Sequence, residues 1–500
     1  MSSKRRVILV GWDAADWKVI APLVEQGLMP HTNRLIETGV MGNLATLNPM
    51  LSPMLWTSIA TGKRPYKHGI HGFAEPDPYT GAIRPITNLS RTTKAVWNIL
   101  NQNDKKSIVV GWWPSSPAEP IHGAMVSNHF QQPVASLEEP WPIRPGTIHP
   151  AELTEQLASL RVHPHELDGD MLRSFVPLAP NINQEKDRRL LSLAKVIAEV
   201  SGIQAAVTHL IGTIKDWDFA AVYFDGIDHL GHAFMKYHPP RLDWISEADF
   251  EMYQGVVNGG YIYHDMMLGS LMDLAGPDAT VILISDHGFH PDHLRPRSLP
   301  NEPAGPAAEH RQFGIFVASG PGLKKDELVF GASLLDITPT LLTLFDLPVG
   351  RDMDGKPLLS IYEEQCRPTV QAIESWDQVD GNDGRHPPET QIDAVDAHAV
   401  LQQLVDLGYI DQPNENLTQA FEESHRELQY NLARAYVDGS KFSEAAALFE
   451  SLWTRWPYEN RFGVHLLQTQ MNMQDALAAR ATMEQLRERN GLPVITLRMK

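Results

Sequence analysis

The sequence VILVGWDAAD at residues 7–16 and the sequence VILISDHG at residues 281–288 share one pattern, an unbroken apolar run followed by an aspartate. Apolar residues that do not alternate with polar ones are typical of a strand covered on both faces, as in a parallel sheet. Comparable runs are SIVVG at 107–111, FAAVYF at 219–224 and FGIFV at 313–317, with helical periodicity at 93–104 and 187–214. We therefore predict an α/β fold in which helices sandwich a mostly parallel sheet.

The chain has 500 residues, which is long for one compact core and predicts more than one domain. We assign a catalytic domain to residues 1–376. Within it, residues 114–215 contain an irregular stretch rich in Pro and His, which indicates either an inserted cap over the sheet edge or a surface excursion. The sequence QVDGNDGRHPPE at 378–389 has the composition of a linker, so we assign an acidic linker to residues 377–394.

Residues 395–500 favour a small all-α region. The offsets of a tetratricopeptide repeat fall on Leu432, Ala433, Tyr436, Ala445, Phe449 and Pro457. A weaker second copy follows one period later, and two copies are fewer than an independent array needs. We expect them to lean on a helix at 395–407 or on the main domain, and an ordinary amphipathic helical tail is the alternative. Such a region indicates a protein partner or self-association.

Composition narrows the function classes. The formal net charge of −19 argues against a broad nucleic-acid surface, because phosphate backbones attract Lys and Arg. Cys366 is the only cysteine, which excludes an intramolecular disulfide and a cysteine-rich metal site. The apolar run after the basic start is too short for a signal peptide, and we expect no membrane span. A cytoplasmic protein is the expectation.

Acids and histidines follow several of the predicted strands. In an open parallel sheet the carboxyl ends of the strands share one edge, so these side chains should converge there. They are Asp13, Asp228, His232, Asp286, His287 and His310. Several carboxylates at one edge need neutralisation, and carboxylate with imidazole suits a divalent metal such as zinc. Taken singly, each has a plainer alternative: a strand-end Asp often caps a helix, and Asp–His pairs are common on surfaces.

Ser52 is the candidate nucleophile. Because Pro53 follows it, we predict that Ser52 is the N-cap and Pro53 the first position of a helix that continues through residues 54–60. A hydroxyl at a helix N-terminus lies among unpaired N–H groups and the positive end of the dipole, which favour a bound phosphate oxygen. A nearby metal lowers the pKa of such a hydroxyl. The surrounding sequence lacks the Gly-x-Ser-x-Gly elbow, so a Ser-His-Asp hydrolase is not indicated.

In their order along the chain these motifs resemble the alkaline phosphatase superfamily, and within it the type I phosphodiesterase and nucleotide pyrophosphatase branch. The matching segments are Asp13, Ser52 through Thr61-Gly62, Asp228 to His232, Asp286-His287-Gly288 and His310. The resemblance covers roughly residues 5–360. It implies an alkaline phosphatase-like fold and a metal-dependent hydrolase that acts on small-molecule phosphate esters.

The resemblance also implies roles for individual residues. Asp228, His232 and His310 would hold one divalent metal. Asp13, Asp286 and His287 would hold another, with Ser52 as a further ligand and as the nucleophile. The metals would be Zn²⁺, or alternatively Mn²⁺. The reaction would pass through a phosphoserine that water then hydrolyses.

The chain departs from this branch at three places, one of which is the sequence Asp-Ala-Ala-Asp after the first strand, where Asp-Gly is more typical. The nucleophile is usually threonine, which makes Thr57 a second and distant candidate beside Ser52. The branch also places an asparagine, which binds a phosphate oxygen, where this chain has Phe73. Arg91 and Lys94 are candidate phosphate-binding residues, with an ordinary surface charge as the alternative.

Three other functions remain in view. A phosphomonoesterase or a phosphomutase of the same superfamily would use the same metals and serine. A sulfatase is discounted, because Trp56 stands where its motif requires Arg. In a different class, the chain would be a tetratricopeptide scaffold with an inactive phosphatase-like domain.

Overall fold

The computed structural model describes residues 5–131, 136–387, 390, 400–405 and 408–490. A central sheet of nine strands has the order β13-β2-β12-β9-β1-β8-β5-β6-β7. In chain order the strands are β1 (Arg6–Trp12), β2 (Val40–Ala45), β5 (Ser107–Val110), β6 (Gly123–Val126), β7 (Ile148–His149), β8 (Phe219–Phe224), β9 (Ala279–Ile284), β12 (Phe313–Ser319) and β13 (Glu327–Ser333).

The middle of the sheet is parallel, as the apolar runs predicted. Neighbouring strands from β9 through β1, β8 and β5 to β6 all run in the same direction. The segment predicted at 313–317 is part of β12, which runs antiparallel to both β2 and β9. An unbroken apolar run reports burial on both faces and not direction, which is why the sequence could not distinguish this strand.

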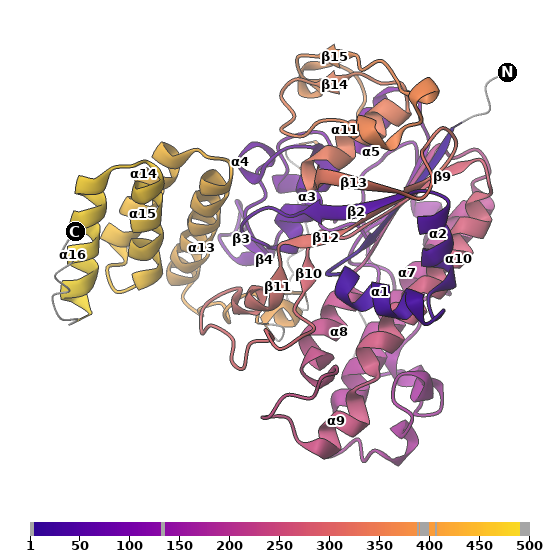
Figure 1. The fold of residues 1–500 in the computed structure, drawn as a ribbon, viewed down its shortest axis with the longest axis horizontal. Coiled ribbons are helices and arrows are strands. Elements are labelled where there is room, and N and C mark those ends of the chain that lie inside the picture. Colours follow the sequence, from indigo (N-terminus) through magenta and orange to yellow (C-terminus); the bar gives the residue numbers. More distant parts are fainter. Residues whose placement is uncertain (1–4, 132–135, 388–389, 391–399, 406–407, 491–500) are drawn as a thin grey trace.

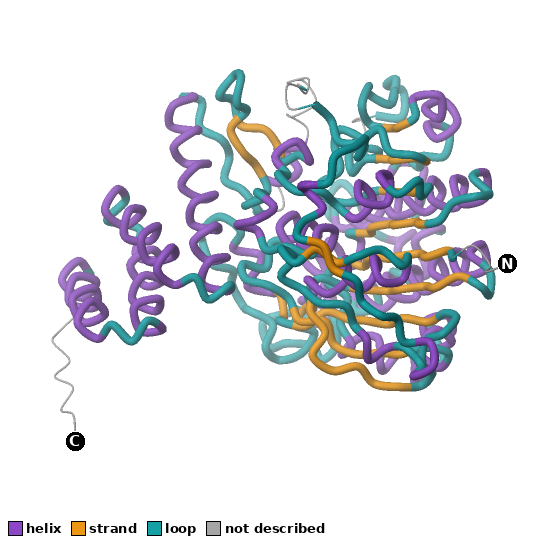
Figure 2. Tube along the Cα trace, turned by 90° about the horizontal axis from the view of Figure 1, so that it is seen from above, coloured by secondary structure: helices purple, strands orange, loops and turns teal. Residues whose placement is uncertain are grey.

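Helices cover both faces of the sheet (Figures 1 and 2). Ile8 and Val10 of β1 face one apolar core, while Val7 and Leu9 face the other. The first core includes residues of α1 (Trp17–Glu25), α2 (Pro30–Glu37), α7 (Arg189–Thr213), α8 (Gly226–Phe234), α9 (Glu247–Tyr253) and α10 (Val256–Ala275). The second includes residues of α3 (Ser52–Thr61), α5 (Val96–Gln102) and α11 (Ile337–Leu344). The predicted sandwich of helices around the sheet is confirmed.

Shorter elements connect these layers. The short helices are α4 (Pro65–His68) and α6 (Thr154–Ala158), and the two-stranded ribbons are β3 (Ala74–Pro76) with β4 (Ile83–Pro85), β10 (Gly288–Phe289) with β11 (His310–Arg311), and β14 (Val349–Gly350) with β15 (Ala372–Ile373).

The stretch 114–215, predicted to contain a cap, also contributes elements to the main sheet and its helical layer. β6 and β7 lie within this stretch and extend the main sheet, and α7 belongs to the helical layer that covers it. The irregular part between β7 and α7 packs onto that layer, where the ring of Phe175 lies 6.0 Å from the ring of Tyr263 on α10. The two strands and α7 are therefore parts of the main domain, and an inserted cap formed by the irregular part stays a prediction.

Helix α7 bears on the expectation that the chain has no membrane span. It is long and apolar enough, by length and composition, to cross a membrane, and no other described helix is. However, 61% of its most apolar window is buried inside the fold, where it packs onto β5 and β8. Its apolarity is therefore explained by its place between the sheet and the other helices.

The C-terminal region is helical, as predicted, and stands beside the sheet as a stack of helices (Figure 1). Its helices are α13 (Leu417–Asp438), α14 (Phe442–Arg455), α15 (Asn460–Asn472) and α16 (Ala476–Arg489). Ala433, Ala445 and Phe449, three of the predicted repeat positions, are fully buried between these helices. The assignment to the tetratricopeptide class stays a prediction, as does a partner for this region. Of the helix expected at 395–407, residues 400–405 are helical and residues 395–399 and 406–407 lie outside the described residues.

The C-terminal region packs against the catalytic domain. Tyr66 on α4 stacks against Tyr436 on α13 with ring centroids 5.1 Å apart, and Arg64 forms an ion pair with Asp438. The stretch predicted as a linker also packs against the domain where it is described, since His386 is hydrogen-bonded to the carbonyl of Ala118. The acidic composition of this stretch therefore does not mark a free connection.

Candidate metal centre

Three strands bring the predicted acids to one edge of the sheet. β1 ends at Trp12 and is followed by Asp13; in the ladder Trp12 pairs with Phe224, and Gly11 pairs with Ile284. Asp228 follows β8 on α8, and Asp286 follows β9. The carboxyl ends of β1, β8 and β9 are thus level with one another, which confirms the predicted convergence.

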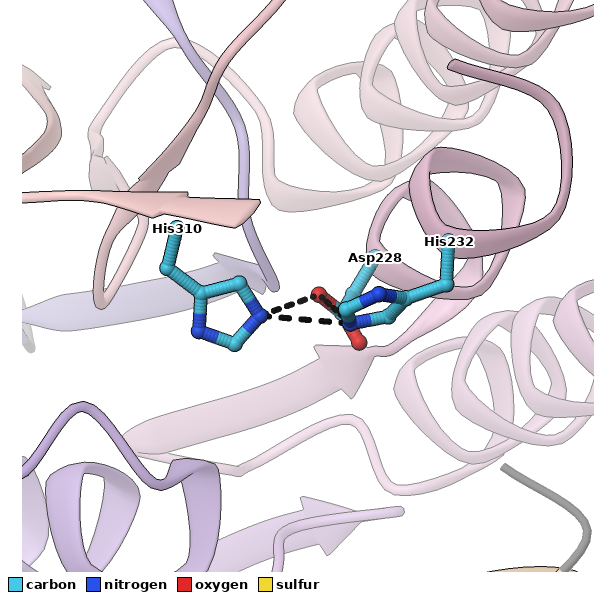
Figure 3. Close-up of side chains that lie close together, drawn as sticks. All are labelled: Asp228, His232 and His310. Atoms are coloured by element: carbon cyan, nitrogen blue, oxygen red, sulfur yellow. Dashed lines mark hydrogen bonds and ion pairs between the residues drawn. The ribbon is translucent and has the colours of Figure 1, made fainter. Parts of the chain in front are cut away.

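The first cluster consists of Asp228, His232 and His310 (Figure 3). Asp228 and His232 lie one turn apart on α8, and the Nε2 atom of His232 is 3.3 Å from Oδ1 of Asp228. His310, on β11, approaches from the opposite side, with its Nε2 atom 3.5 Å from the same Oδ1 and 3.2 Å from Nε2 of His232. Gly231 allows α8 to lie close to Phe289, because a Cβ at this position would be only 2.8 Å from the phenyl ring.

The second cluster consists of Asp13, Asp286 and His287. Nε2 of His287 lies 3.3 Å from Oδ1 of Asp13 and 3.5 Å from Oδ2 of Asp286. All three side chains are at most 1% exposed. The imidazole rings of His287 and His310 stack with centroids 3.8 Å apart, so the two clusters are immediate neighbours.

Both clusters fit a divalent metal ion. Buried atoms that form no hydrogen bond within the described part of the chain include Oδ1 of Asp13, Oδ1 of Asp228, Oδ2 of Asp286 and Nε2 of His287. A tetrahedral ion with bonds of about 2.0–2.1 Å holds its ligand atoms about 3.3–3.4 Å apart, which matches the separations in both clusters. Carboxylate oxygens and imidazole nitrogens are the donor set that zinc accepts.

The pKa values within the clusters show the charge imbalance that a cation would relieve. Burial raises the pKa of Asp286 well above its usual value, and the carboxylate of Asp13 adds to the rise. Burial lowers the pKa of His287, but Asp286 and Asp13 outweigh it and raise the value to about 10. At the first cluster, burial is likewise outweighed by Asp228, which raises the pKa of His232 to about 10. The acids therefore favour positive charge at both places.

Each cluster has one aspartate whose second oxygen is held by a tyrosine. Tyr223 donates its hydroxyl to Oδ2 of Asp13 at 2.6 Å, and Trp56 adds an indole N–H at 3.1 Å. Tyr409 donates its hydroxyl to Oδ2 of Asp228 at 2.7 Å. Burial, reinforced by the neighbouring aspartate, raises the pKa of each tyrosine well above its usual value, so both hydroxyls keep their protons and act as donors.

Four residues that form hydrogen bonds with the side chains of the two clusters were not predicted from the sequence. Three of them had a local signal: Tyr223 is the second-last residue of the FAAVYF strand, Trp56 lies one helical turn after Ser52, and Glu309 immediately precedes His310. The carboxylate of Glu309 lies 2.6 Å from Nδ1 of His232, so it orients the ring whose other nitrogen faces the first cluster. Tyr409 had no such signal, because it comes from the C-terminal region.

Ser52 lies at the start of α3 and is 2% exposed. The N-cap is Leu51, one residue earlier than predicted, so Ser52 is the first helical residue and Pro53 the second. Trp56 lies one turn further on the same face of α3 and reaches Asp13, which directs this face toward the second cluster. The hydroxyl of Thr57 donates to the carbonyl of Pro53 at 2.7 Å, which weakens the alternative nucleophile.

The two candidate phosphate-binding residues, Arg91 and Lys94, form ion pairs and hydrogen bonds with other residues of the chain. Arg91 is buried and forms an ion pair with Glu119 at 2.7 Å. Lys94 is buried and donates to the carbonyls of Trp376 and Val379. Both side chains hold the catalytic domain together, and the contacts of the described residues do not place either of them at the clusters. A phosphate-binding role for either residue stays a prediction.

A third group of potential ligands consists of Glu199, Asp225 and His229. It lines a cavity of about 60 Å³ that also reaches Tyr223 and Leu404. Its members are less buried than those of the two clusters, and burial together with Asp225 raises the pKa of Glu199 well above its usual value. A proton on Glu199 reduces the negative charge of this group without a metal.

The family model that describes type I phosphodiesterase / nucleotide pyrophosphatase matches residues 7–296, more than half of the chain. The chain belongs to this family. Membership confirms the predicted resemblance and the predicted enzyme class, a hydrolase that acts on phosphate ester bonds. A search of curated proteins finds no significant match.

Solved structures with a similar fold include three hydrolases of low sequence identity. Phosphonoacetate hydrolase from Sinorhizobium meliloti 1021 is 17% identical with a TM-score of 0.35, and the match covers 58% of each chain. A putative sulfatase from Bacteroides thetaiotaomicron is 14% identical with a TM-score of 0.43, over 72% of this chain and 76% of the other. Murine ectonucleotide pyrophosphatase / phosphodiesterase 5 is 12% identical with a TM-score of 0.39, over 69% and 95%.

Proposed function

We propose that the protein is a two-metal phosphoesterase that cleaves small-molecule phosphate esters, preferentially diesters, through a phosphoserine on Ser52. The observation that carries the proposal is the convergence of unpartnered, buried ligand atoms into two adjacent clusters at the carboxyl edge of the sheet. Two such ions beside each other would suit the attacking and the leaving oxygen of a phosphoryl transfer. We further propose Zn²⁺ as the metal and the cytoplasm as the location.

The chain's own residues supply the rest of the chemistry. The clusters, once loaded, would supply positive charge that polarises the phosphoryl group and favours the alkoxide of Ser52. Ser52 lies at the N-terminus of α3, where the positive end of the helix dipole favours the negative charge of the phosphoryl oxygens. Burial of Ser52 excludes bulk water, which strengthens each of these interactions.

The bonds change in two steps. The bond from Ser52 Oγ to phosphorus forms as the bond from phosphorus to the leaving oxygen breaks, and the serine's proton goes to the leaving group through solvent. Water then attacks the phosphoserine, returns Ser52 to its hydroxyl form and releases the remaining phosphate ester. A phosphomonoester would follow the same steps with inorganic phosphate as the product.

The test compares Ser52→Ala with Thr57→Val in the full-length chain. Hydrolysis of an aryl phosphodiester and of an aryl phosphomonoester is measured with added Zn²⁺ and with a chelator. We expect Ser52→Ala to lose turnover by about a thousandfold or more, because the covalent route is removed. Thr57→Val should remain active, since its hydroxyl serves only the backbone of α3.

Unchanged turnover in Ser52→Ala, or insensitivity of the wild-type enzyme to the chelator, would refute the mechanism. The ratio of the two rates decides between diesterase and monoesterase. Transfer of the phosphoryl group to a second hydroxyl of the substrate, without release of phosphate, would instead identify a phosphomutase. Lack of turnover on every ester, with the clusters loaded, would favour the scaffold alternative.

A further inference from the structure

Tyr409 connects the C-terminal region to the metal centre. It lies 181 residues after Asp228 in the sequence, and its hydroxyl donates to Oδ2 of that aspartate at 2.7 Å. The side chain is 3% exposed, so the contact is made away from solvent. Its ring meets the ring of His232 edge-on, with centroids 5.7 Å apart. One residue of the C-terminal region thus touches two of the three members of the first cluster.

The position of Tyr409 is fixed on several sides. Its ring stacks on Phe73 at 4.4 Å with an interplanar angle of 19°. Its backbone N–H donates to the carbonyl of Leu404, and its carbonyl accepts from the N–H of Ala304. The apolar cluster that contains Tyr409 also includes Leu51 and Met54, which flank Ser52 on α3. The tyrosine is therefore packed between the first cluster and the helix that carries the nucleophile.

The two carboxylate oxygens of Asp228 have different surroundings. Oδ2 of Asp228 accepts from Tyr409, while Oδ1 forms no hydrogen bond with the described residues and faces His232 and His310. A charge-assisted hydrogen bond of this kind fixes the carboxylate and withdraws negative charge from it. Asp13 and Tyr223 form the same arrangement at the second cluster, entirely within the catalytic domain.

We propose that Tyr409 is a positioning residue for the first cluster, held in place by Phe73, so that the C-terminal region completes the active site. This inference rests on the proposed function, because it assigns Asp228 to a metal. It also accounts for Phe73, which stands where related enzymes have a polar residue. A benzyl ring there cannot bind a phosphoryl oxygen, but it provides the flat apolar surface on which Tyr409 lies.

The experiment uses the full-length chain with the substitution Tyr409→Phe, which removes one oxygen and keeps the stacked ring. The matched control is Tyr430→Phe, which removes the hydroxyl of a buried tyrosine that contacts His465 within the C-terminal helices. Zn²⁺ affinity is measured by chelator competition, and kcat and KM are measured on an aryl phosphate ester. The Tm of the metal-free protein shows whether each variant is folded.

We expect Tyr409→Phe to bind one of two Zn²⁺ ions about 10- to 100-fold more weakly, as is typical when a residue that orients a metal ligand is lost. kcat should fall by a larger factor than KM rises, while Tyr430→Phe matches the wild type in both. A second variant, Phe73→Leu, keeps the phenol but loses the stack, and it should show a smaller loss in the same direction.

The outcomes separate the two proposals. A wild-type chain that binds no Zn²⁺ would refute the proposed function together with this inference. A wild-type chain that binds two Zn²⁺ ions, with unchanged affinity and kcat in Tyr409→Phe, would refute only the role of Tyr409. A loss of activity that accompanies a lower Tm, with unchanged Zn²⁺ affinity, would make Tyr409 a structural residue and overturn the proposal.

Discussion

The two clusters are built alike and supported differently. In each, one aspartate oxygen accepts from a buried tyrosine and the other forms no hydrogen bond with the described residues. At the second cluster the tyrosine is Tyr223, on the strand next to Asp13, whereas at the first it is Tyr409, from the C-terminal region. The candidate ligands of both clusters come from the catalytic domain, but the tyrosine that supports one cluster comes from the C-terminal helical region.

The largest effects should come from the ligands themselves, where the two clusters are equivalent. Asp286→Asn and Asp228→Asn each remove the charge of one ligand and keep its shape. We expect each variant to hold about one metal ion where the wild type holds two, and to lose about a thousandfold in kcat/KM, the order of what a metal ion contributes to phosphoryl transfer. Metal content measured by mass spectrometry, together with the ester assay, checks this. Full metal content in either variant would contradict the assignment of that cluster.

A smaller effect should come from the two tyrosines. Tyr223→Phe should weaken the second cluster as Tyr409→Phe weakens the first, each by about 10- to 100-fold in kcat/KM. Because each hydroxyl acts on a different aspartate, the double variant should lose close to the product of the two factors. The kcat/KM values of the four proteins form a double-mutant cycle. A double variant no worse than either single one would show that the hydroxyls act on one shared feature.

The residues of the site that could be predicted from the sequence are those of the catalytic domain. Asp13, Asp286 and His287 were predictable because each follows an apolar strand, and parallel strands end at one edge. The pair Asp228 and His232 was predictable because it closely follows another apolar strand, at residues 219–224. Tyr409 was not, because its contact depends on how the C-terminal region folds back, and no local pattern encodes that. The direction of β12 and the buried contacts of Arg91 and Lys94 were missed for the same reason: they depend on distant partners.

The interface between the two regions should matter only through Tyr409. Tyr66→Ala removes the stack on Tyr436, a pair worth about 1 kcal/mol, or roughly fivefold in an equilibrium. We expect a fall of about that size in kcat/KM, since the C-terminal region is held less firmly. The same substitution added to Tyr409→Phe should then have little further effect. Tyr458→Ala, at a side chain that is 95% exposed on the C-terminal region, is the matched control and should leave kcat/KM unchanged. An equal loss in both backgrounds would show that Tyr66 acts by another route.

The smallest effect on metal content and kcat/KM is expected from a substitution in the third group of potential ligands. This substitution tests which properties allow a cluster of acids and histidines to bind a metal ion. Glu199, Asp225 and His229 have suitable ligand atoms within 4.8 Å of one another, as the two metal clusters do. They differ in that all three members of this group are only partly buried, and the pKa of Glu199, raised by burial and Asp225, favours its protonated form. Glutamine closely resembles a protonated glutamate, and Glu199→Gln should therefore keep two metal ions and nearly the wild-type kcat/KM. A wild type that holds three ions, and a variant that holds two, would show that buried acids in this fold attract a cation wherever three ligands meet. Among the three groups that the described residues form, only the first two contain buried carboxylate oxygens with no hydrogen-bond partner, and we expect metal binding to follow that property.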